Sequence, residues 1–218
     1  MYPLTNKISR SDFLKTSGAA LGGMFTLSHY ACKGEMGSLK QLMIEGKTNY
    51  SLVLPFQATG EERQAAEKLQ LFLSKMTRRI NIVNEQEYNG KNAIYLGNTD
   101  FARATGVESA SLEGEAYVFK RMDNNLIISG GGEKGLLNGV NSLLESFGFR
   151  KYSADDAVMI PKEESLRLPE DELKVPRIKY RTTNYYDARD ETYATWHKLS
   201  STDSWGLFVH TFDLLVPP

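Results

Sequence analysis

The stretch GGGEKGLLNGV, residues 130–140, contains the chain's most suggestive chemical motif. Gly130, Gly132 and Gly135 have the spacing G-x-G-x-x-G, follow the apolar run LIIS and open a segment with helical spacing. Asp155 lies about 20 residues further on, which completes the pattern of a dinucleotide-binding turn. In such a turn the glycines let the backbone approach a pyrophosphate, and the acid binds a ribose hydroxyl.

The segments around these glycines favour a structural role over a nucleotide site. A dinucleotide site needs a central parallel strand before the glycines and a buried strand after the helix, with the acid at its end. Residues 125–130 instead resemble the second arm of a hairpin, and the tract FGFRKYSADD after the helix is short and polar. We expect the glycines to allow a sharp turn from strand to helix, although exposed N–H groups there could still hold an anion.

The composition gives little support to metal, cofactor or nucleic-acid chemistry. Cys32 is the single cysteine, which excludes an internal disulfide and a cysteine-based zinc cluster. The histidines, His29, His197 and His210, lie far apart without metal-ligand spacing, so we expect no metal site and no cofactor. The formal net charge is -1 and no basic stripe is present, which argues against nucleic acid as a main partner.

The beginning of the chain has the features of an export signal. Lys7, Arg10 and Lys15 precede the small, apolar stretch TSGAALGGMFTL, and the small residue Ala31 stands before the expected cleavage point. The apolar stretch is too short for a membrane span. We therefore expect residues 1–32 to be a signal peptide and the mature protein to be exported to the periplasm or the cell surface.

The route of export has open interpretations. SRSDFLK, residues 9–15, resembles the twin-arginine motif, but Ser11 stands where the second arginine belongs. Ala31-Cys32 resembles a bacterial lipobox, in which the cysteine is lipidated after cleavage; a general secretory signal with an incidental cysteine is the alternative. We expect a membrane partner only through a lipid on Cys32, with the small and polar residues 33–47 as a tether.

Residues 48–172 alternate predicted strands and helices. Apolar residues at helical spacing predict two long helices, over 60–77 and 133–147. Two strands flank the turn Asp123-Asn124 and predict an antiparallel hairpin. The expected strands are 50–55, 80–85, 93–98, 116–122 and 125–130. This order predicts an α/β fold, an α+β sandwich in which both helices cover one face of a mixed sheet.

A charged tract bracketed by prolines, residues 169–176, predicts a domain boundary. Beyond it we expect a strand over 173–182, a polar loop, a helix over 192–201 with Asp190 as N-cap, and a strand over 205–212.

Two groups of residues resemble a pattern in carbohydrate-active enzymes. The helix pattern G-x-x-x-G-V-x-x-L-L-E-x-x-G and the aromatic strand after it are matched by Gly135, Gly139, Val140, Leu143, Leu144, Glu145, Gly148 and Tyr152. The start of the barrel is matched by Pro176, Tyr180 and Arg181. Over about residues 48–218 the chain resembles the non-catalytic N-terminal domain and barrel start of family-67 α-glucuronidases and family-20 β-hexosaminidases, most closely a set of uncharacterised bacterial barrel proteins of that layout.

The resemblance implies a small mixed-sheet domain, residues 48–172, that packs on a catalytic TIM barrel. A complete barrel needs roughly 200 residues or more, whereas about 40 follow Pro176. Residues 173–218 are therefore expected to be an incomplete first βαβ portion of that barrel. The implied partners are a glycan, either an oligosaccharide or a polysaccharide, and the missing C-terminal barrel of the same protein.

The same resemblance implies substrate contacts on the barrel start. Arg181 ends the first predicted barrel strand, where its planar donors suit vicinal sugar hydroxyls; a barrel-mouth ion pair is the alternative. Asn184 and Tyr185 follow in the first loop, where a tyrosine either stacks on a sugar or packs in the protein. His210 ends the second predicted strand and either binds substrate or is satisfied within the barrel.

Catalytic residues are not expected in this chain. In the related families the catalytic carboxylates come from later barrel strands, and Asp190 and Glu191 fit a helix N-terminus better. We expect the N-terminal part of an exported glycoside-hydrolase-like protein of carbohydrate metabolism, not catalytic by itself. The alternatives are a surface-tethered carbohydrate-binding or interaction module and a nucleotide-binding domain.

Overall fold

The computed structural model describes residues 41–77, 80–163 and 165–200. The expected signal peptide with Cys32, most of the tether, and His210 lie outside these residues. None of the helices in the described part is long and apolar enough to cross a membrane.

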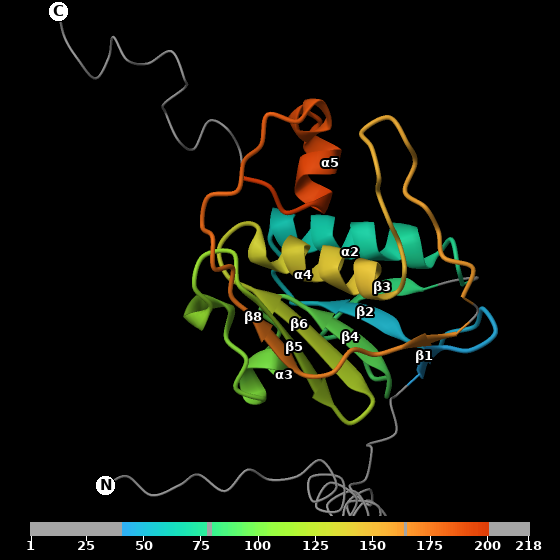
Figure 1. Cartoon of the computed structure of the whole chain (residues 1–218). Coiled ribbons are helices and arrows are strands. Elements are labelled where there is room, and N and C mark those ends of the chain that lie inside the picture. Colours follow the sequence, from blue (N-terminus) through green and yellow to red (C-terminus); the bar gives the residue numbers. More distant parts are fainter. Residues whose placement is uncertain (1–40, 78–79, 164, 201–218) are drawn as a thin grey trace, which may run out of the picture. The chain divides into compact units, whose positions relative to one another are not determined.

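A six-stranded mixed sheet with the strand order β3-β2-β4-β6-β5-β8 forms the centre of the fold (Figure 1). Its strands are β2 (Ser51–Leu54), β3 (Asn81–Asn84), β4 (Ala93–Leu96), β5 (Tyr117–Met122), β6 (Asn125–Gly130) and β8 (Glu172–Lys174). β3, β2, β4 and β6 are parallel, while β5 pairs antiparallel with both β6 and β8. The predicted hairpin of β5 and β6 is confirmed, and Asp123 in its turn has a positive φ.

β6 has a position that the sequence did not predict. It lies inside the sheet and runs parallel to β4. The expectation that the strand before the glycines is neither central nor parallel is therefore wrong. The apolar run explains the position: Leu126, Ile127 and Ile128 are all 0% exposed, as expected for a strand that is covered on both faces.

Two helices, α2 (Gly60–Leu73) and α4 (Gly135–Ser146), lie side by side on one face of the sheet, as predicted (Figure 1). The Thr59 hydroxyl accepts the Glu62 N–H, and the Glu62 carboxylate accepts the Thr59 N–H. This reciprocal capping box satisfies two free amides and fixes where α2 begins.

The core has one part on each face of the sheet. Between the sheet and the two helices lie the predicted inner-face residues, all buried: Ala65, Leu69, Phe72, Leu73, Leu136, Val140, Leu143, Leu144 and Phe147. Met76, also predicted for this face, is partly buried and lies beyond the end of α2. The opposite face is covered by the short helix α3 (Asp100–Ala104), which buries Ala102 against Val53 and Tyr95.

The glycine-rich corner brings α4 against the sheet at close range. A Cβ on Gly130 would lie 1.9 Å from the backbone N of Leu136, and one on Gly135 would lie 2.5 Å from the carbonyl oxygen of Ala116. Gly132, between them, has a φ of +53°, a region that favours glycine. These contacts support the structural role that the sequence favoured for the glycines.

After α4 the chain first adds a strand to a second, smaller sheet and then adds one more strand to the six-stranded sheet. β7 (Leu166–Arg167) pairs with β1 (Gln41–Met43) in a separate two-stranded sheet. Residues 172–174, inside the predicted boundary tract, then form the edge strand β8 on β5. Asp171 fixes this register, because its carboxylate accepts from the Lys120 ammonium at 2.6 Å and from the Arg121 backbone N–H at 2.7 Å.

The strand expected over 173–182 is wrong in its position. Strand pairing stops at Lys174 because this residue lies opposite Tyr117, the first residue of β5, and residues 175–185 contain no strand. A 3-10 turn, η2 (Tyr186–Arg189), precedes a short helix, α5 (Glu191–Trp196). The predicted cap is confirmed, since the Asp190 carboxylate accepts the Tyr193 N–H at 2.7 Å. We call residues 177–200 the C-terminal segment.

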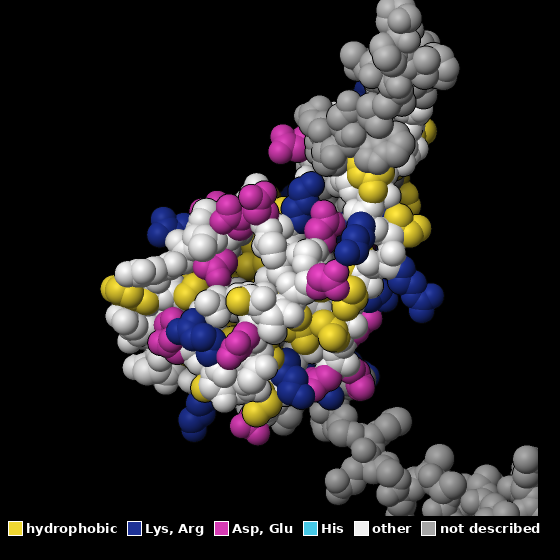
Figure 2. Space-filling view, turned by 90° about the vertical axis from the view of Figure 1, so that its left-hand side faces the viewer, with side chains coloured by type: hydrophobic (Ala, Val, Ile, Leu, Met, Phe, Trp, Pro, Cys, Tyr) yellow, Lys and Arg dark blue, Asp and Glu magenta, His cyan; other side chains and the backbone are white. Residues whose placement is uncertain are grey.

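Charged side chains are spread over the molecule. On the face drawn in Figure 2, acidic and basic side chains are interspersed, and no basic stripe gathers there. This distribution agrees with the net charge of -1.

The corner at Gly130 predicts a strong effect of one methyl group. We expect Gly130→Ala to lower the free energy of unfolding by about 3 kcal/mol or more, because the backbone of α4 has to move away from β6. Urea denaturation followed by circular dichroism measures this change.

Gly60→Ala is the matched control, since no atom lies within 4 Å of a Cβ placed there. We expect it to be neutral or to stabilise by about 0.5 kcal/mol. Equal stability of the two variants would contradict a structural need for glycine at 130.

Candidate functional site

Arg181, the leading sequence candidate for a sugar contact, is half-buried among protein groups. Its Nη2 pairs with the carboxylate of Glu115, just before β5. Its Nε donates to the Lys198 carbonyl at 2.8 Å, and its Nη1 donates to the Ile178 carbonyl at 2.7 Å. The backbone N–H of Arg181 also donates to the Ser200 hydroxyl at 3.0 Å. The guanidinium thus joins both ends of the C-terminal segment to the sheet, and its role as a sugar contact stays a prediction.

Asn184 and Tyr185 lie on the exposed side of the same segment. The Tyr185 ring is tilted against Tyr193 of α5, with 6.2 Å between the centroids. The charge of nearby Asp187 raises the pKa of the Tyr185 phenol, because it opposes a second negative charge. The side chains of Arg181 and Tyr185 therefore turn toward different neighbours.

Trp196, which the sequence reasoning did not single out, anchors the C-terminal segment to the helix layer. Its indole is 1% exposed and meets the Phe72 ring of α2 edge-on, with 5.6 Å between the centroids. Figure 1 shows α5 on the side of α2 and α4 that faces away from the sheet. The sequence does offer a signal for this burial, because Trp196 is a large apolar residue in an otherwise mostly polar short helix. Burial of an aromatic side chain of this size contributes a few kcal/mol to the attachment.

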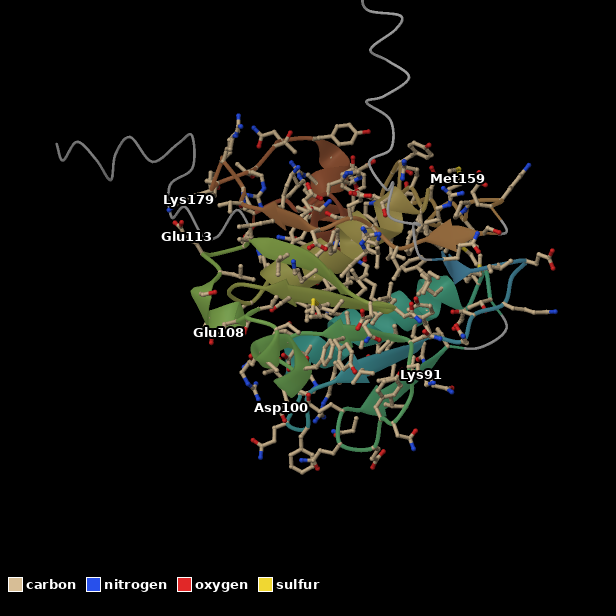
Figure 3. All side chains as sticks on the ribbon, turned by 90° about the horizontal axis from the view of Figure 1, so that it is seen from below. Lys91, Asp100, Glu108, Glu113, Met159 and Lys179 are labelled. Atoms are coloured by element: carbon tan, nitrogen blue, oxygen red, sulfur yellow. The ribbon has the colours of Figure 1, made fainter. Side chains whose placement is uncertain are left out.

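Polar contacts reinforce this attachment at several points. Lys198 pairs with Glu145 of α4 at 2.7 Å, and the Asn141 amide donates to the Thr195 carbonyl at 2.8 Å. The His197 Nε2 atom also contacts the Lys151 carbonyl at 3.0 Å. Lys179 forms an ion pair with Glu113 at 3.0 Å, and Figure 3 shows these two residues close together. The C-terminal segment is therefore part of the folded domain.

Lys68 of α2 also lies at this contact. Its Nζ is 5.2 Å from the centroid of the Trp196 ring. Burial and the nearby charge of Lys198 lower the pKa of Lys68 to about 8, and the opposite charge of Glu145 offsets part of this effect. At a pH below this pKa, Lys68 is charged in surroundings that disfavour the charge, and this destabilises the folded state.

The glycine-rich corner lines a hollow of about 350 Å³ between the starts of α2 and α4. Glu61, Glu62 and Glu133 also line it, so a pyrophosphate there would meet three carboxylates. Asp155 is exposed in a turn, and the chain beyond α4 supplies no parallel strand beside β6 in the described part. The surroundings of the motif therefore disfavour a dinucleotide.

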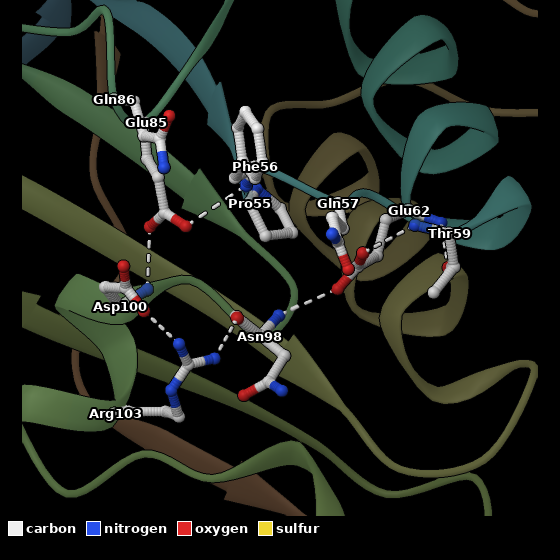
Figure 4. A pocket seen from close by; sticks show the side chains of 10 residues that line it. All are labelled: Pro55, Phe56, Gln57, Thr59, Glu62, Glu85, Gln86, Asn98, Asp100 and Arg103. Atoms are coloured by element: carbon white, nitrogen blue, oxygen red, sulfur yellow. Dashed lines mark hydrogen bonds and ion pairs between the residues drawn. The ribbon is translucent and has the colours of Figure 1, made fainter.

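A second hollow, of about 410 Å³, lies at the carboxyl ends of the parallel strands (Figure 4). We call it the edge pocket. It is lined by residues 55–57 and 59 after β2, Glu62 of α2, 85–86 after β3, and Asn98, Asp100 and Arg103 after β4. The carboxyl ends of parallel strands are the usual place for ligands in open α/β sheets.

Two carboxylates hold the loops around the edge pocket together. Glu62 accepts from the backbone N–H of Thr59 at 2.9 Å and of Asn98 at 2.8 Å. Glu85 accepts from the backbone N–H of Phe56 at 3.1 Å and of Asp100 at 2.6 Å. Each carboxylate oxygen thus already binds an amide. Both side chains are therefore engaged in joining the loops around the edge pocket.

Arg103 lines the edge pocket on the side of the loop after β4. Its Nη1 donates to the Asn98 carbonyl at 2.6 Å, and its Nη2 pairs with Asp100. The lining also includes the side-chain amides of Gln57, Gln86 and Asn98, the exposed Phe56 ring, Pro55 and Thr59. Within the described residues, no group of three or more His, Cys, Asp or Glu side chains could hold a metal ion.

The chain matches no protein-family model and no curated protein. It is similar to a solved family GH115 4-O-methyl-α-glucuronidase with specificity for decorated arabinogalactans, with 19% identity, 65% of this chain and 19% of that chain covered, and a TM-score of 0.45. It is also similar to a GH138 enzyme targeting pectin rhamnogalacturonan II, with 18% identity, 45% of this chain and 10% of that chain covered, and a TM-score of 0.31. Both neighbours are glycoside hydrolases of which the chain spans a fifth of the length or less, and this likeness assigns neither a family nor an activity.

Trp196→Ala tests the attachment of the C-terminal segment. We expect faster cleavage by a protease between residues 177 and 200, with residues 41–174 still folded, because the segment loses its largest buried group. Tyr186→Ala is the control, since Tyr186 is 75% exposed. Cleavage rates that do not differ between the two variants would contradict the anchoring role.

Lys68→Met tests whether the charge of Lys68 lowers the free energy of unfolding. The folded pKa of about 8 lies below the usual 10.5, so the unfolded chain binds more protons between these values, and stability rises with pH there. The variant keeps the packing on Trp196 and is expected to be more stable than the parent at pH 7, with an advantage that shrinks by pH 10. Urea denaturation at both pH values measures this; a constant advantage would oppose it.

The acidic lining of the glycine-rich corner predicts that nucleotides do not bind. We expect no change in melting temperature when NAD or ATP is added at millimolar concentration, because three carboxylates lie around the hollow. A reproducible rise with either nucleotide, lost in Glu133→Trp, would restore the dinucleotide interpretation.

Proposed function

We propose that this chain is the non-catalytic N-terminal part of an exported glycoside-hydrolase-like protein and that it supports a catalytic barrel. The resemblance to the α-glucuronidase and β-hexosaminidase layout motivates the proposal. Two parts of that pattern, the hairpin and the helix that follows the glycine-rich corner, have counterparts in the fold. The sugar and the linkage are left open.

The attachment of the C-terminal segment is the observation that carries this proposal. Trp196 and the pair of Arg181 with Glu115 hold the segment at two separate places on the domain. Ser200, just before the predicted strand 205–212, is therefore held against Arg181. A segment that is held in place up to this residue favours a domain that carries a neighbouring domain over one joined to it by a loose linker.

The edge pocket supports the absence of catalysis. Glycoside hydrolysis commonly uses two carboxyl groups, one of which donates a proton to the leaving oxygen. Glu62 and Glu85 instead hold backbone amides. The surface-tethered carbohydrate-binding module, the second interpretation of the sequence, shares this feature, and in it Cys32 would carry the lipid anchor.

The proposal predicts that the mature chain, produced as residues 33–218 without the lipid-bearing Cys32, does not turn over aryl glycosides. Aryl β-N-acetylglucosaminide and aryl α-glucuronide are the substrates to test, with release of the aryl alcohol followed by absorbance. Clear turnover by the purified chain, lost in Glu85→Gln, would contradict the non-catalytic role.

The DNA sequence downstream of Pro218 distinguishes the barrel-supporting domain from the carbohydrate-binding module. We expect the reading frame beyond Pro218 to encode further barrel strands with Asp or Glu at their ends. A stop codon directly after Pro218 would overturn the barrel-supporting role and favour the binding module.

A further inference from the structure

We propose that the edge pocket binds a neutral or amino sugar, with the Phe56 ring stacked on the sugar. The sugar class rests on the proposed function; the location and the charge preference rest on the pocket itself. The pocket lies apart from Arg181, Asn184 and Tyr185, the sugar contacts that the sequence suggested. This site would let the domain hold a glycan without acting on it.

Phe56 is exposed although its backbone is held firmly. Its side chain is 56% exposed, and it stands between the edge pocket and a smaller hollow of about 230 Å³ on its other side. Its N–H donates to Glu85 at 3.1 Å, and its carbonyl accepts from the Asn84 side-chain amide at 3.3 Å. A ring on a fixed backbone loses little freedom when a ligand stacks on it, which favours binding.

Side-chain amides next to this ring are available for hydroxyl groups. Within the described part of the chain, the side-chain amides of Gln57, Gln86 and Asn98 form no hydrogen bond; only the backbones of Gln86 and Asn98 do. In Figure 4 the Asn98 amide points away from the bonds that its backbone makes to Glu62 and Arg103. Each amide offers a donor and an acceptor side by side, which suits neighbouring hydroxyls of a sugar.

The charges around the edge pocket select against anions. Glu62, Glu85 and Asp100 contribute three carboxylates, and the single cation, Arg103, is paired with Asp100. The start of α2, which would otherwise attract an anion, is already capped by Thr59 and Glu62. A phosphate or a uronic acid would therefore be repelled, while a neutral sugar or an ammonium-bearing amino sugar would not.

Calorimetric titration of the mature chain tests this site. The probes are cellohexaose and xylohexaose as neutral sugars, a glucosamine hexamer as the amino sugar, and hexagalacturonate as the anion. We expect binding of at least one neutral or amino probe and none of hexagalacturonate. Phe56→Ala should weaken that binding about tenfold, the scale of one lost stacking contact.

Tyr152→Ala is the matched control, because Tyr152 is an aromatic residue of similar exposure, 67%, outside the pocket. Binding of none of the neutral or amino probes would overturn the inference, as would equal weakening by both variants or tighter binding of hexagalacturonate. None of these results depends on turnover or on the sequence beyond Pro218, so the proposed function is tested separately.

Discussion

The close approach of α4 to β6 at the glycine-rich corner is the constraint on which the other layers depend. Because Gly130 and Gly135 have no Cβ, the first turn of α4 lies against the end of β6 and the segment before β5. This position puts Leu143 and Leu144 into the core and sets α2 beside α4. The outer side of this pair then receives Trp196. The motif that resembles a nucleotide signature therefore allows the sheet, the helix pair α2 and α4, and the C-terminal segment to pack on one another in this order.

Several carboxylates in this domain act as partners of the backbone. Glu62 and Glu85 tie together the loops after β2, β3 and β4, and Asp171 fixes the edge strand in the same way. This use explains why the loops at the carboxyl edge of the sheet keep their positions around the edge pocket. Together with Asp100, Glu62 and Glu85 also give the pocket an excess of negative charge over Arg103, the cation that lines it, and this excess is the basis of the proposed preference for a neutral or amino sugar.

Local patterns predicted local structure well. The spacing of apolar residues identified the buried faces of α2 and α4, Asp123-Asn124 identified the hairpin, and Asp190 identified the cap of α5. Contacts between distant residues were not predictable in this way. The parallel pairing of β6 with β4, the edge strand β8, and the contact of Trp196 with Phe72 depend on which surfaces remain free after the core forms. The edge pocket could not be predicted for the same reason, since its residues come from the three loops after β2, β3 and β4 and from two helices, α2 and α3.

The proposed role of this domain is to hold a sugar at the carboxyl edge of its sheet and to perform no chemistry on it. Chemical-shift mapping of the ¹⁵N-labelled mature chain, titrated with the tightest-binding neutral or amino oligosaccharide, tests it most directly. We expect the backbone amide signals of Phe56, Gln57 and Asn98 to shift and those of Gly130–Gly135 and Tyr185 to stay in place. We also expect the oligosaccharide signals to stay unchanged over time. Shifts confined to Tyr185 and its neighbours, or cleavage of the oligosaccharide, would contradict it.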